Sequence, residues 1–145
     1  MSRQNIANLI ETAFASTQSP GESFDDISAT KQDEGIVDYF RGTTWRGHTV
    51  RDLRYHSAAL AFFTDSAFRY WLPAFMLASL EDAKIADVIP ESIESRMHDA
   101  ARLAVFTAEE LRAISAFLHE FAEQFDDGSF RTTAERIERA ADGRP

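Results

Sequence analysis

The most apolar stretch of the chain lies between residues 67 and 80, where Arg69 carries the one formal charge. At helical spacing one broad face of this stretch holds Phe68, Trp71, Leu72, Phe75, Met76 and Ser79. A helix that is apolar nearly all round is typical of the interior of a bundle. The stretch is shorter than the roughly 20 residues that a membrane-spanning helix needs. We therefore predict a buried helix over about 65–82, kinked near Pro73 because proline has no amide hydrogen.

Apolar residues recur at helical spacing on both sides of this stretch and predict further helices. The predicted ranges are 2–15, about 30–40, 50 to about 57, and a helix that has Pro90 in its first turn. Residues 16–29 contain Ser19-Pro20-Gly21 and are predicted to form an acidic loop. The apolar run over 58–63 fits either a continued helix or an extended link, since its periodicity does not distinguish them.

The clearest helix start in the chain lies at Thr107. Thr107 and Glu110 have the pattern of a capping box, in which each side chain accepts a hydrogen bond from the other residue's backbone. The helix that follows is predicted to end at Asp126-Asp127-Gly128. Thr132 then opens the pattern of a short terminal helix over 132–142.

The patterns together predict an all-α protein, because no strand or hairpin signal is found. A chain of 145 residues is long enough for one domain with its own core. Its hydrophobic fraction of 44% and charged fraction of 27% are those of an ordinary globular domain. We predict a single domain over 1–145, a bundle of about six or seven helices around the helix at 65–82, with a helical core over 30–126.

Composition and charge narrow the classes of function. The absence of cysteine excludes disulfides and thiolate chemistry. The first residues lack the apolar run of a signal peptide, so we expect no export by that route, a cytoplasmic location and no membrane association. A net charge of −9 argues against nucleic acid as a partner, because binding phosphates requires a basic surface. The same charge favours a basic protein partner through electrostatic steering.

Charged residues are segregated into two neighbouring blocks. The acidic block contains Lys31 as its one cation and these acids: Glu22, Asp25, Asp26, Asp33, Glu34 and Asp38. The next block, over 41–56, is called the arginine island here and contains Arg41, Arg46, Arg51 and Arg54 together with Trp45, His48, Tyr55 and His56. Its guanidinium groups have the chemistry to receive an anion. Alternatively they pair with the acids just before them, because the blocks are adjacent and opposite in sign.

Arg69 and Tyr70 interrupt the apolar helix shortly before Pro73. A lone arginine in such a helix must reach solvent, a carboxylate or a backbone carbonyl freed by the proline. One interpretation is a structural arginine that holds a bend, and the other is a partly exposed Arg-Tyr pair on a binding surface. The candidate binding residues are therefore Trp45, Arg54, Tyr55, His56, Arg69 and Tyr70.

Signatures of catalysis and of metal binding are missing or isolated. The chain has no glycine-rich phosphate loop and no Gly-x-Ser-x-Gly elbow. His119 and Glu123 stand at a spacing comparable to that of a metal-binding pair on a helix, and one such pair is weak evidence for a metal site. We therefore predict no catalytic residue, no metal site and no cofactor.

The string from Phe62 to Leu80, together with Trp45 and Leu53-Arg54-Tyr55-His56, resembles an uncharacterised bacterial domain family. The core motif of that family reads Ala-Phe-Arg-Tyr-aromatic-Leu-Pro-Ala, which residues 67–74 match. The resemblance extends through Phe106-Thr107 and the helix after it, so it covers most of the chain. It implies a single bacterial domain and carries no known activity, so it leaves function open.

These observations favour a non-catalytic, protein-binding module. Its most concrete form is an immunity-like or antitoxin-like inhibitor of a basic bacterial protein, with the acidic block as the partner-facing surface. An alternative is a small enzyme that acts on an anionic small molecule through the Arg-Tyr-His site at residues 54–56. A third is a structural homo-oligomer that buries surplus phenylalanine, since the chain contains 12 of these residues.

Overall fold

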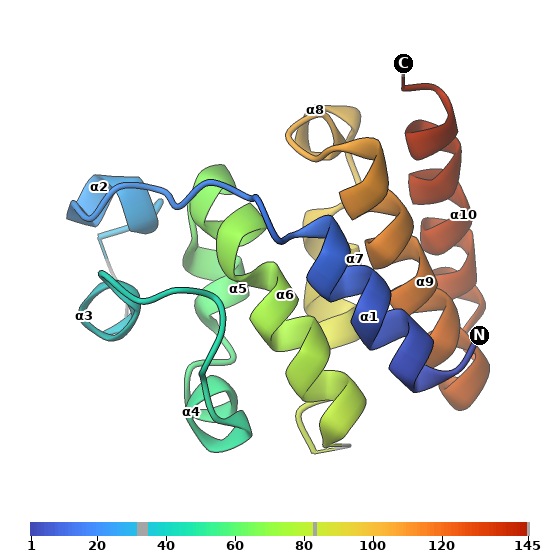
Figure 1. The fold of residues 1–145 in the computed structure, drawn as a ribbon, viewed down its shortest axis with the longest axis horizontal. Coiled ribbons are helices and arrows are strands. Elements are labelled where there is room, and N and C mark those ends of the chain that lie inside the picture. Colours follow the sequence, from blue (N-terminus) through green and yellow to red (C-terminus); the bar gives the residue numbers. More distant parts are fainter. Residues whose placement is uncertain (32–34, 83, 145) are drawn as a thin grey trace. The chain divides into compact units, whose positions relative to one another are not determined.

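A computed structural model describes residues 1–31, 35–82 and 84–144 of the chain. Over these residues the secondary structure is helical and no strand is formed, which confirms the all-α prediction (Figure 1). The chain divides into two compact units. One, called the split unit here, combines Met1–Ala15 with Pro90–Pro145, and the other, the middle unit, is Ser16–Ile89. The single-domain organisation over 1–145 stays a prediction.

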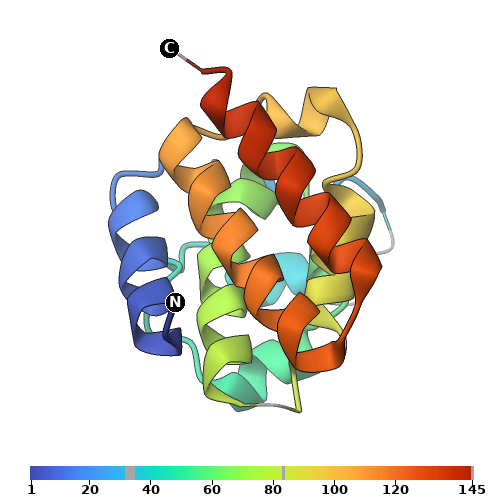
Figure 2. The ribbon, with the colours of Figure 1, turned by 90° about the vertical axis from the view of Figure 1, so that its right-hand side faces the viewer.

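The split unit is built on two long helices, α9 (Ala108–Phe125) and α10 (Gly128–Asp142). Helix α1 (Arg3–Ala13) packs on the other side of α9, so that α1, α9 and α10 lie side by side in this order (Figures 1 and 2). The shorter α7 (Ile89–Arg96) and α8 (Ala100–Leu103) lead into α9. The side chains buried in this unit include Ile6, Ile10, Phe14, Met97, Phe106, Leu111, Ile114, Phe117, Phe121 and Ile137.

Polar contacts hold the helices of the split unit in register. The buried hydroxyl of Ser115 on α9 donates to the carbonyl of Ala134 on α10 at 2.8 Å. Near the end of α10, the guanidinium of Arg144 donates to the carbonyls of Leu103 and Phe106, each at 2.7 Å. These bonds satisfy acceptors that the end of a short helix leaves open.

The turn between α9 and α10 differs from the predicted one. Asp126 adopts a left-handed conformation with φ of 49° and ends α9 as predicted. The carboxylate of Asp127 then accepts the amide hydrogens of Ser129 and Phe130 and begins α10 at Gly128. The terminal helix therefore begins four residues before the predicted Thr132, whose hydroxyl instead donates to the carbonyl of Gly128.

The middle unit contains α2 (Phe24–Ile27), α3 (Ile36–Phe40), α4 (Val50–Tyr55), α5 (Ala59–Phe62) and α6 (Asp65–Glu81). Helix α6 is the helix predicted at 65–82, with Pro73 inside it and most of its residues buried. The hydroxyl of Thr64 accepts the amide of Ala67 at the start of α6 and donates to the carbonyl of Asp26 at 2.7 Å. One side chain therefore caps α6 and ties α2 to it.

Aromatic rings fill the core of the middle unit. Phe40 lies 5.1 Å from Phe63 and 5.2 Å from Trp71, measured between ring centroids. Phe63 stacks on Trp71 at 5.4 Å. The indole N–H of Trp71 donates to the hydroxyl of Thr43 at 3.2 Å, so the polar edge of this buried ring has a partner.

Short helices account for the differences from the predicted boundaries. Ten helices are described where six or seven were expected, and five of the ten are shorter than seven residues. The predicted acidic loop contains α2, which Ser23 and Asp26 open with a capping box. The helix expected over 30–40 is helical from Ile36, and residues 32–34 lie outside the described residues. The ambiguous run over 58–63 forms α5 and then an extended residue, Phe63, that bridges to Ser28.

Helix length and apolarity also bear on membrane insertion. In the part of the chain that the structure describes, no helix is both long enough and apolar enough to cross a bilayer.

The first testable prediction concerns the two threonines that were expected to begin helices. Thr107 accepts the amide of Glu110 at 3.1 Å, and the Glu110 carboxylate accepts the amide of Thr107 at 2.8 Å. Thr107→Ala should therefore lower the free energy of unfolding by about 0.5–2 kcal/mol. Thr132→Ala should leave it unchanged or raise it slightly, because alanine is the better residue inside a helix. Urea midpoints measure both effects, and a larger loss for Thr132→Ala would contradict the observed helix boundaries.

Candidate functional site

A network of hydrogen bonds joins Tyr39 to the arginine island. The Tyr39 hydroxyl and His48 Nδ1 lie 2.8 Å apart, and His48 Nε2 lies 2.8 Å from the carbonyl of Thr44. A carbonyl only accepts, so Nε2 carries the hydrogen in this contact, and in the neutral ring Nδ1 accepts from the Tyr39 hydroxyl. The hydrogen bond to the Thr44 carbonyl therefore fixes the tautomer of His48, in which Nδ1 accepts the hydrogen bond from the Tyr39 hydroxyl.

His56 and Asp52 complete this group of ionisable side chains. The ring of His56 stacks on Tyr39 with centroids 4.3 Å apart. Burial lowers the pKa of His48 and of His56, and the carboxylate of Asp52 partly offsets both shifts. Burial raises the pKa of Tyr39, and the negative charge of the nearby Asp52 carboxylate raises it further. Tyr39, His48 and His56 are therefore all held in their neutral forms near pH 7.

A hollow of about 630 Å³ lies over α4 within the middle unit. It is lined by Val50, Arg51, Asp52, Arg54, Tyr55, Asp82 and Lys84. Within the described residues, none of its three cations forms an ion pair. The carboxylate of Asp82 accepts the backbone amide of Lys84 at 2.9 Å. The hollow therefore combines two guanidinium groups and an ammonium group with two carboxylates and the exposed ring of Tyr55.

The six predicted binding residues are not brought together at this hollow. Arg54 and Tyr55 line it, whereas His56 stacks on Tyr39. Trp45 is only 3% exposed and carries the guanidinium of Arg46 over its ring at 3.9 Å. Tyr70 is 7% exposed and packs edge-on against Trp71, while its neighbour Arg69 is half-buried on α6. Trp45 and Tyr70 are therefore core residues here.

The acidic block is exposed wherever the structure describes it. Glu22, Asp25, Asp26 and Asp38 are all exposed, and Asp33 and Glu34 lie outside the described residues. The Asp26 carboxylate accepts the amide of Ser23 at 3.2 Å in the capping box of α2. Across the described ranges, the side chains of Glu22, Asp25 and Asp38 form neither an ion pair nor a hydrogen bond.

The two oppositely charged blocks meet at one described contact. The guanidinium Nε of Arg41 donates to the backbone carbonyl of Glu22 at 2.8 Å, and the carboxylate of Glu22 does not take part. Among the described residues, no ion pair joins the acidic block to the arginine island. The alternative in which the arginine island pairs with the acids before it is thus not formed among the described residues.

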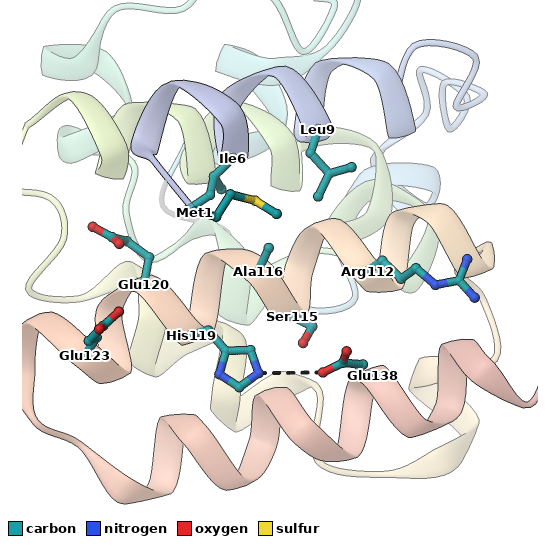
Figure 3. A pocket seen from close by; sticks show the side chains of 10 residues that line it. All are labelled: Met1, Ile6, Leu9, Arg112, Ser115, Ala116, His119, Glu120, Glu123 and Glu138. Carbon is teal, nitrogen blue, oxygen red and sulfur yellow. Dashed lines mark ion pairs between the residues drawn. The ribbon is translucent and has the colours of Figure 1, made fainter.

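Sequence reasoning missed a groove within the split unit (Figure 3). It has a volume of about 380 Å³ and lies between α1, α9 and α10. Ile6 and Leu9 come from α1, and His119 on α9 faces Glu138 on α10, with Nε2 and the carboxylate oxygen 3.7 Å apart. The sequence signal was limited to the amphipathic patterns of these helices, which do not show that a gap remains between them.

Comparison with known proteins identifies the family. The model of a family of unknown function, DUF6714, matches residues 2–139, which is most of the chain. This chain belongs to the DUF6714 family. Neither the curated proteins nor the solved structures contain a match. The prediction that the chain is a member of a family of unknown function is confirmed, and the bacterial origin stays a prediction.

Metal binding was considered for this DUF6714 protein because His119 and Glu123 have a suitable spacing. In the structure His119 is paired with Glu138, as described above. Taking only the residues that are described, no three His, Asp or Glu side chains gather in a way that could hold a metal ion.

The second testable prediction follows from the lowered pKa values of His48 and His56 in this DUF6714 protein. An unfolded histidine titrates near pH 6.5, so below that pH the unfolded chain binds more protons than the folded one. The free energy of unfolding should therefore fall as the pH is lowered from about 7 to 5. His48→Gln should make this dependence shallower, while His98→Gln, at an exposed histidine of the split unit, should not. Chemical denaturation at a series of pH values measures the slopes, and equal slopes for His48→Gln and the wild type would contradict the prediction.

Proposed function

We propose that this DUF6714 protein is a non-catalytic module that binds a basic protein through its acidic block. The observation that carries the proposal is the state of Glu22, Asp25 and Asp38, which are exposed and form no ion pair within the described residues. Their charges remain available to a partner, in a chain whose net charge is −9.

The competing account was that the arginine island neutralises these acids. The described contact between the blocks uses a backbone carbonyl, so the carboxylate of Glu22 is not engaged in it. Charges of one sign on an exposed surface raise the association rate with an oppositely charged partner. The chemistry of the surface therefore fits fast recognition of a basic protein.

The finer form of the proposal is an immunity-like or antitoxin-like inhibitor that acts in the bacterial cytoplasm. Its support is the acidity of the chain, its small size and the absence of catalytic signatures from the sequence. An inhibitor of this kind needs a surface and no reacting group, which agrees with acids that are exposed and uninvolved in the core.

The third testable prediction uses two variants of equal charge. Glu22→Gln, Asp25→Asn and Asp38→Asn together remove three charges from the acidic block. Asp26 is left in place because its carboxylate belongs to a helix cap. The matched control combines Glu11→Gln, Asp87→Asn and Glu135→Gln, three exposed acids elsewhere.

Both triple variants and the wild type are used to capture proteins from a lysate of the source cells, and a captured basic protein is then purified for rate measurements. The acidic-block triple should slow association by roughly tenfold at low salt, and the control triple should have little effect. The rate of the wild type should fall steeply between 0.1 and 1 M salt, since the Debye length drops from about 10 to 3 Å. Equal rates for the two triples would contradict the proposal.

A second candidate function is the binding of a small anion in the hollow over α4. The specific observation in its favour is that Arg51, Arg54 and Lys84 outnumber Asp52 and Asp82 in the lining of this hollow and form no ion pair in the described part of the chain. Guanidinium groups bind phosphate and carboxylate oxygens in a bidentate manner, and a neighbouring ammonium adds charge. This candidate retains the Arg-Tyr part of the predicted enzyme site.

The fourth testable prediction concerns this hollow. Inorganic phosphate, followed by NMR, should shift the amide signals of Tyr55 and Lys84. Arg54→Gln should raise the dissociation constant by about tenfold, because it removes a charge-assisted contact. Arg131→Gln removes an exposed arginine of α10 and serves as the control. Equal dissociation constants for the two variants would exclude a specific anion site over α4.

A further inference from the structure

The groove of the split unit has the dimensions of a small-molecule site. Its volume of about 380 Å³ falls within the range of roughly 300–1,000 Å³ that is usual for ligand pockets. Ile6 and Leu9 of α1 and Ala116 of α9 give it an apolar lining (Figure 3). Ala116 is half-buried, and its small side chain leaves space on α9 that a larger residue would fill.

Ionisable side chains are distributed unevenly around this apolar lining. Glu120 and Glu123 are one helical turn apart on α9, and their carboxylates lie near the same end of the groove (Figure 3). Arg112 lies toward the opposite end, and His119 and Glu138 face each other between α9 and α10 (Figure 3). Two carboxylates therefore stand at one end of the groove and a guanidinium toward the other.

The existing contacts show which end can take a further charge. The guanidinium of Arg112 is paired with Asp142 at 3.6 Å, and Glu120 accepts from Arg3 at 2.9 Å. Glu123 is exposed and forms no ion pair among the residues that the structure describes. Partly exposed ion pairs hold weakly, so an incoming cation can share Glu120 with Arg3. The acidic end thus has one free carboxylate and one that is weakly engaged.

We propose that this groove binds a small organic cation, an ammonium group carried on a short apolar body. The ammonium hydrogens are donated to the carboxylates of Glu120 and Glu123, and the body lies over Ile6, Leu9 and Ala116. Three carboxylates line the groove against one guanidinium and the amino group of Met1, and the net charge of −9 also attracts cations. The site goes beyond the proposed function, because it uses none of the residues of the acidic block.

The fifth testable prediction separates the charge of the ligand from its apolar body. Hexylammonium, hexanol, hexanoate and methylammonium are titrated into the full chain while NMR follows the backbone amides. Hexylammonium should bind about tenfold more tightly than hexanol, because an ammonium–carboxylate hydrogen bond is charge-assisted. It should also bind more tightly than methylammonium, which buries no apolar surface. The largest shifts should fall on Leu9, Ala116 and Glu123.

Variants of the protein test the placement of the ligand. Glu123→Gln should weaken hexylammonium about three- to tenfold and leave hexanol unchanged. Ala116→Leu should weaken both ligands by filling the groove. Glu135→Gln removes an exposed carboxylate of α10 that does not line the groove, and it should change neither. Unchanged denaturation midpoints for Glu123→Gln and Glu135→Gln make the comparison one of binding alone.

Several results would overturn the proposal. They are no binding of hexylammonium at millimolar concentration, tighter binding of hexanoate, equal binding of hexylammonium and hexanol, and equal effects of Glu123→Gln and Glu135→Gln. None of these results depends on the acidic block, so the failure of this site and the failure of the proposed function are distinguishable.

Discussion

The burial of Trp71 against Phe40 and Phe63 is the contact on which the arrangement of the middle unit depends. Phe40 ends α3, and the hydroxyl of Thr43 accepts from the Trp71 indole while it donates to the Phe40 carbonyl. The loop after α3 is therefore fixed to α6 through a ring and through a hydrogen bond at once. Tyr39, the residue before Phe40, is then held where its hydroxyl meets His48 and its ring meets His56. The geometry of the arginine island thus follows from the packing of one tryptophan.

The packing of the middle unit is compatible with its charges because exposed ion pairs contribute little to the free energy of unfolding, typically about 0–1 kcal/mol. Folding has little to gain from bringing the acidic block onto the arginine island, whereas the aromatic core has much to gain from close packing. The position of the loop over 41–49 is accordingly determined by its aromatic contacts. Within this loop, Arg41 donates a hydrogen bond to the backbone carbonyl of Glu22. Among the residues that the structure describes, the acidic block and the arginine island form no ion pair with each other, so each block can serve a different partner. This separation is why the acidic block and the hollow over α4 are distinct candidates.

Helix starts were predicted correctly where one residue is a clear N-cap candidate. Thr107 with Glu110 acts as expected, and Thr64 caps the helix predicted at 65–82, because a threonine that accepts an amide hydrogen favours one position, the N-cap. The pair Asp126-Asp127 was harder to interpret, because one aspartate ends α9 in a left-handed conformation while the next begins α10. Aspartate is suited to both positions, so the pattern at 126–128 was assigned to the end of one helix only. The capping box of α2 was missed for a similar reason, since Asp26 takes the place of the usual glutamate.

The candidate sites depend on distances that a linear pattern does not contain. Arg54 and Tyr55 were predicted as binding residues and do line a hollow, but Lys84 joins them from beyond the end of α6. Trp45 was grouped with them because it is near them in the sequence, but its ring is buried. The residue type alone does not show this, because aromatic residues occur both in cores and on binding surfaces. The groove of the split unit shows the same limit more strongly, since α1 and α9 are about a hundred residues apart in the chain. Each of its helices has an ordinary amphipathic pattern, and the small side chain of Ala116 lines the groove from α9 while Leu9 lines it from α1 (Figure 3). Periodicity determines which side of a helix faces inward, whereas the volume of single side chains determines whether a ligand can enter.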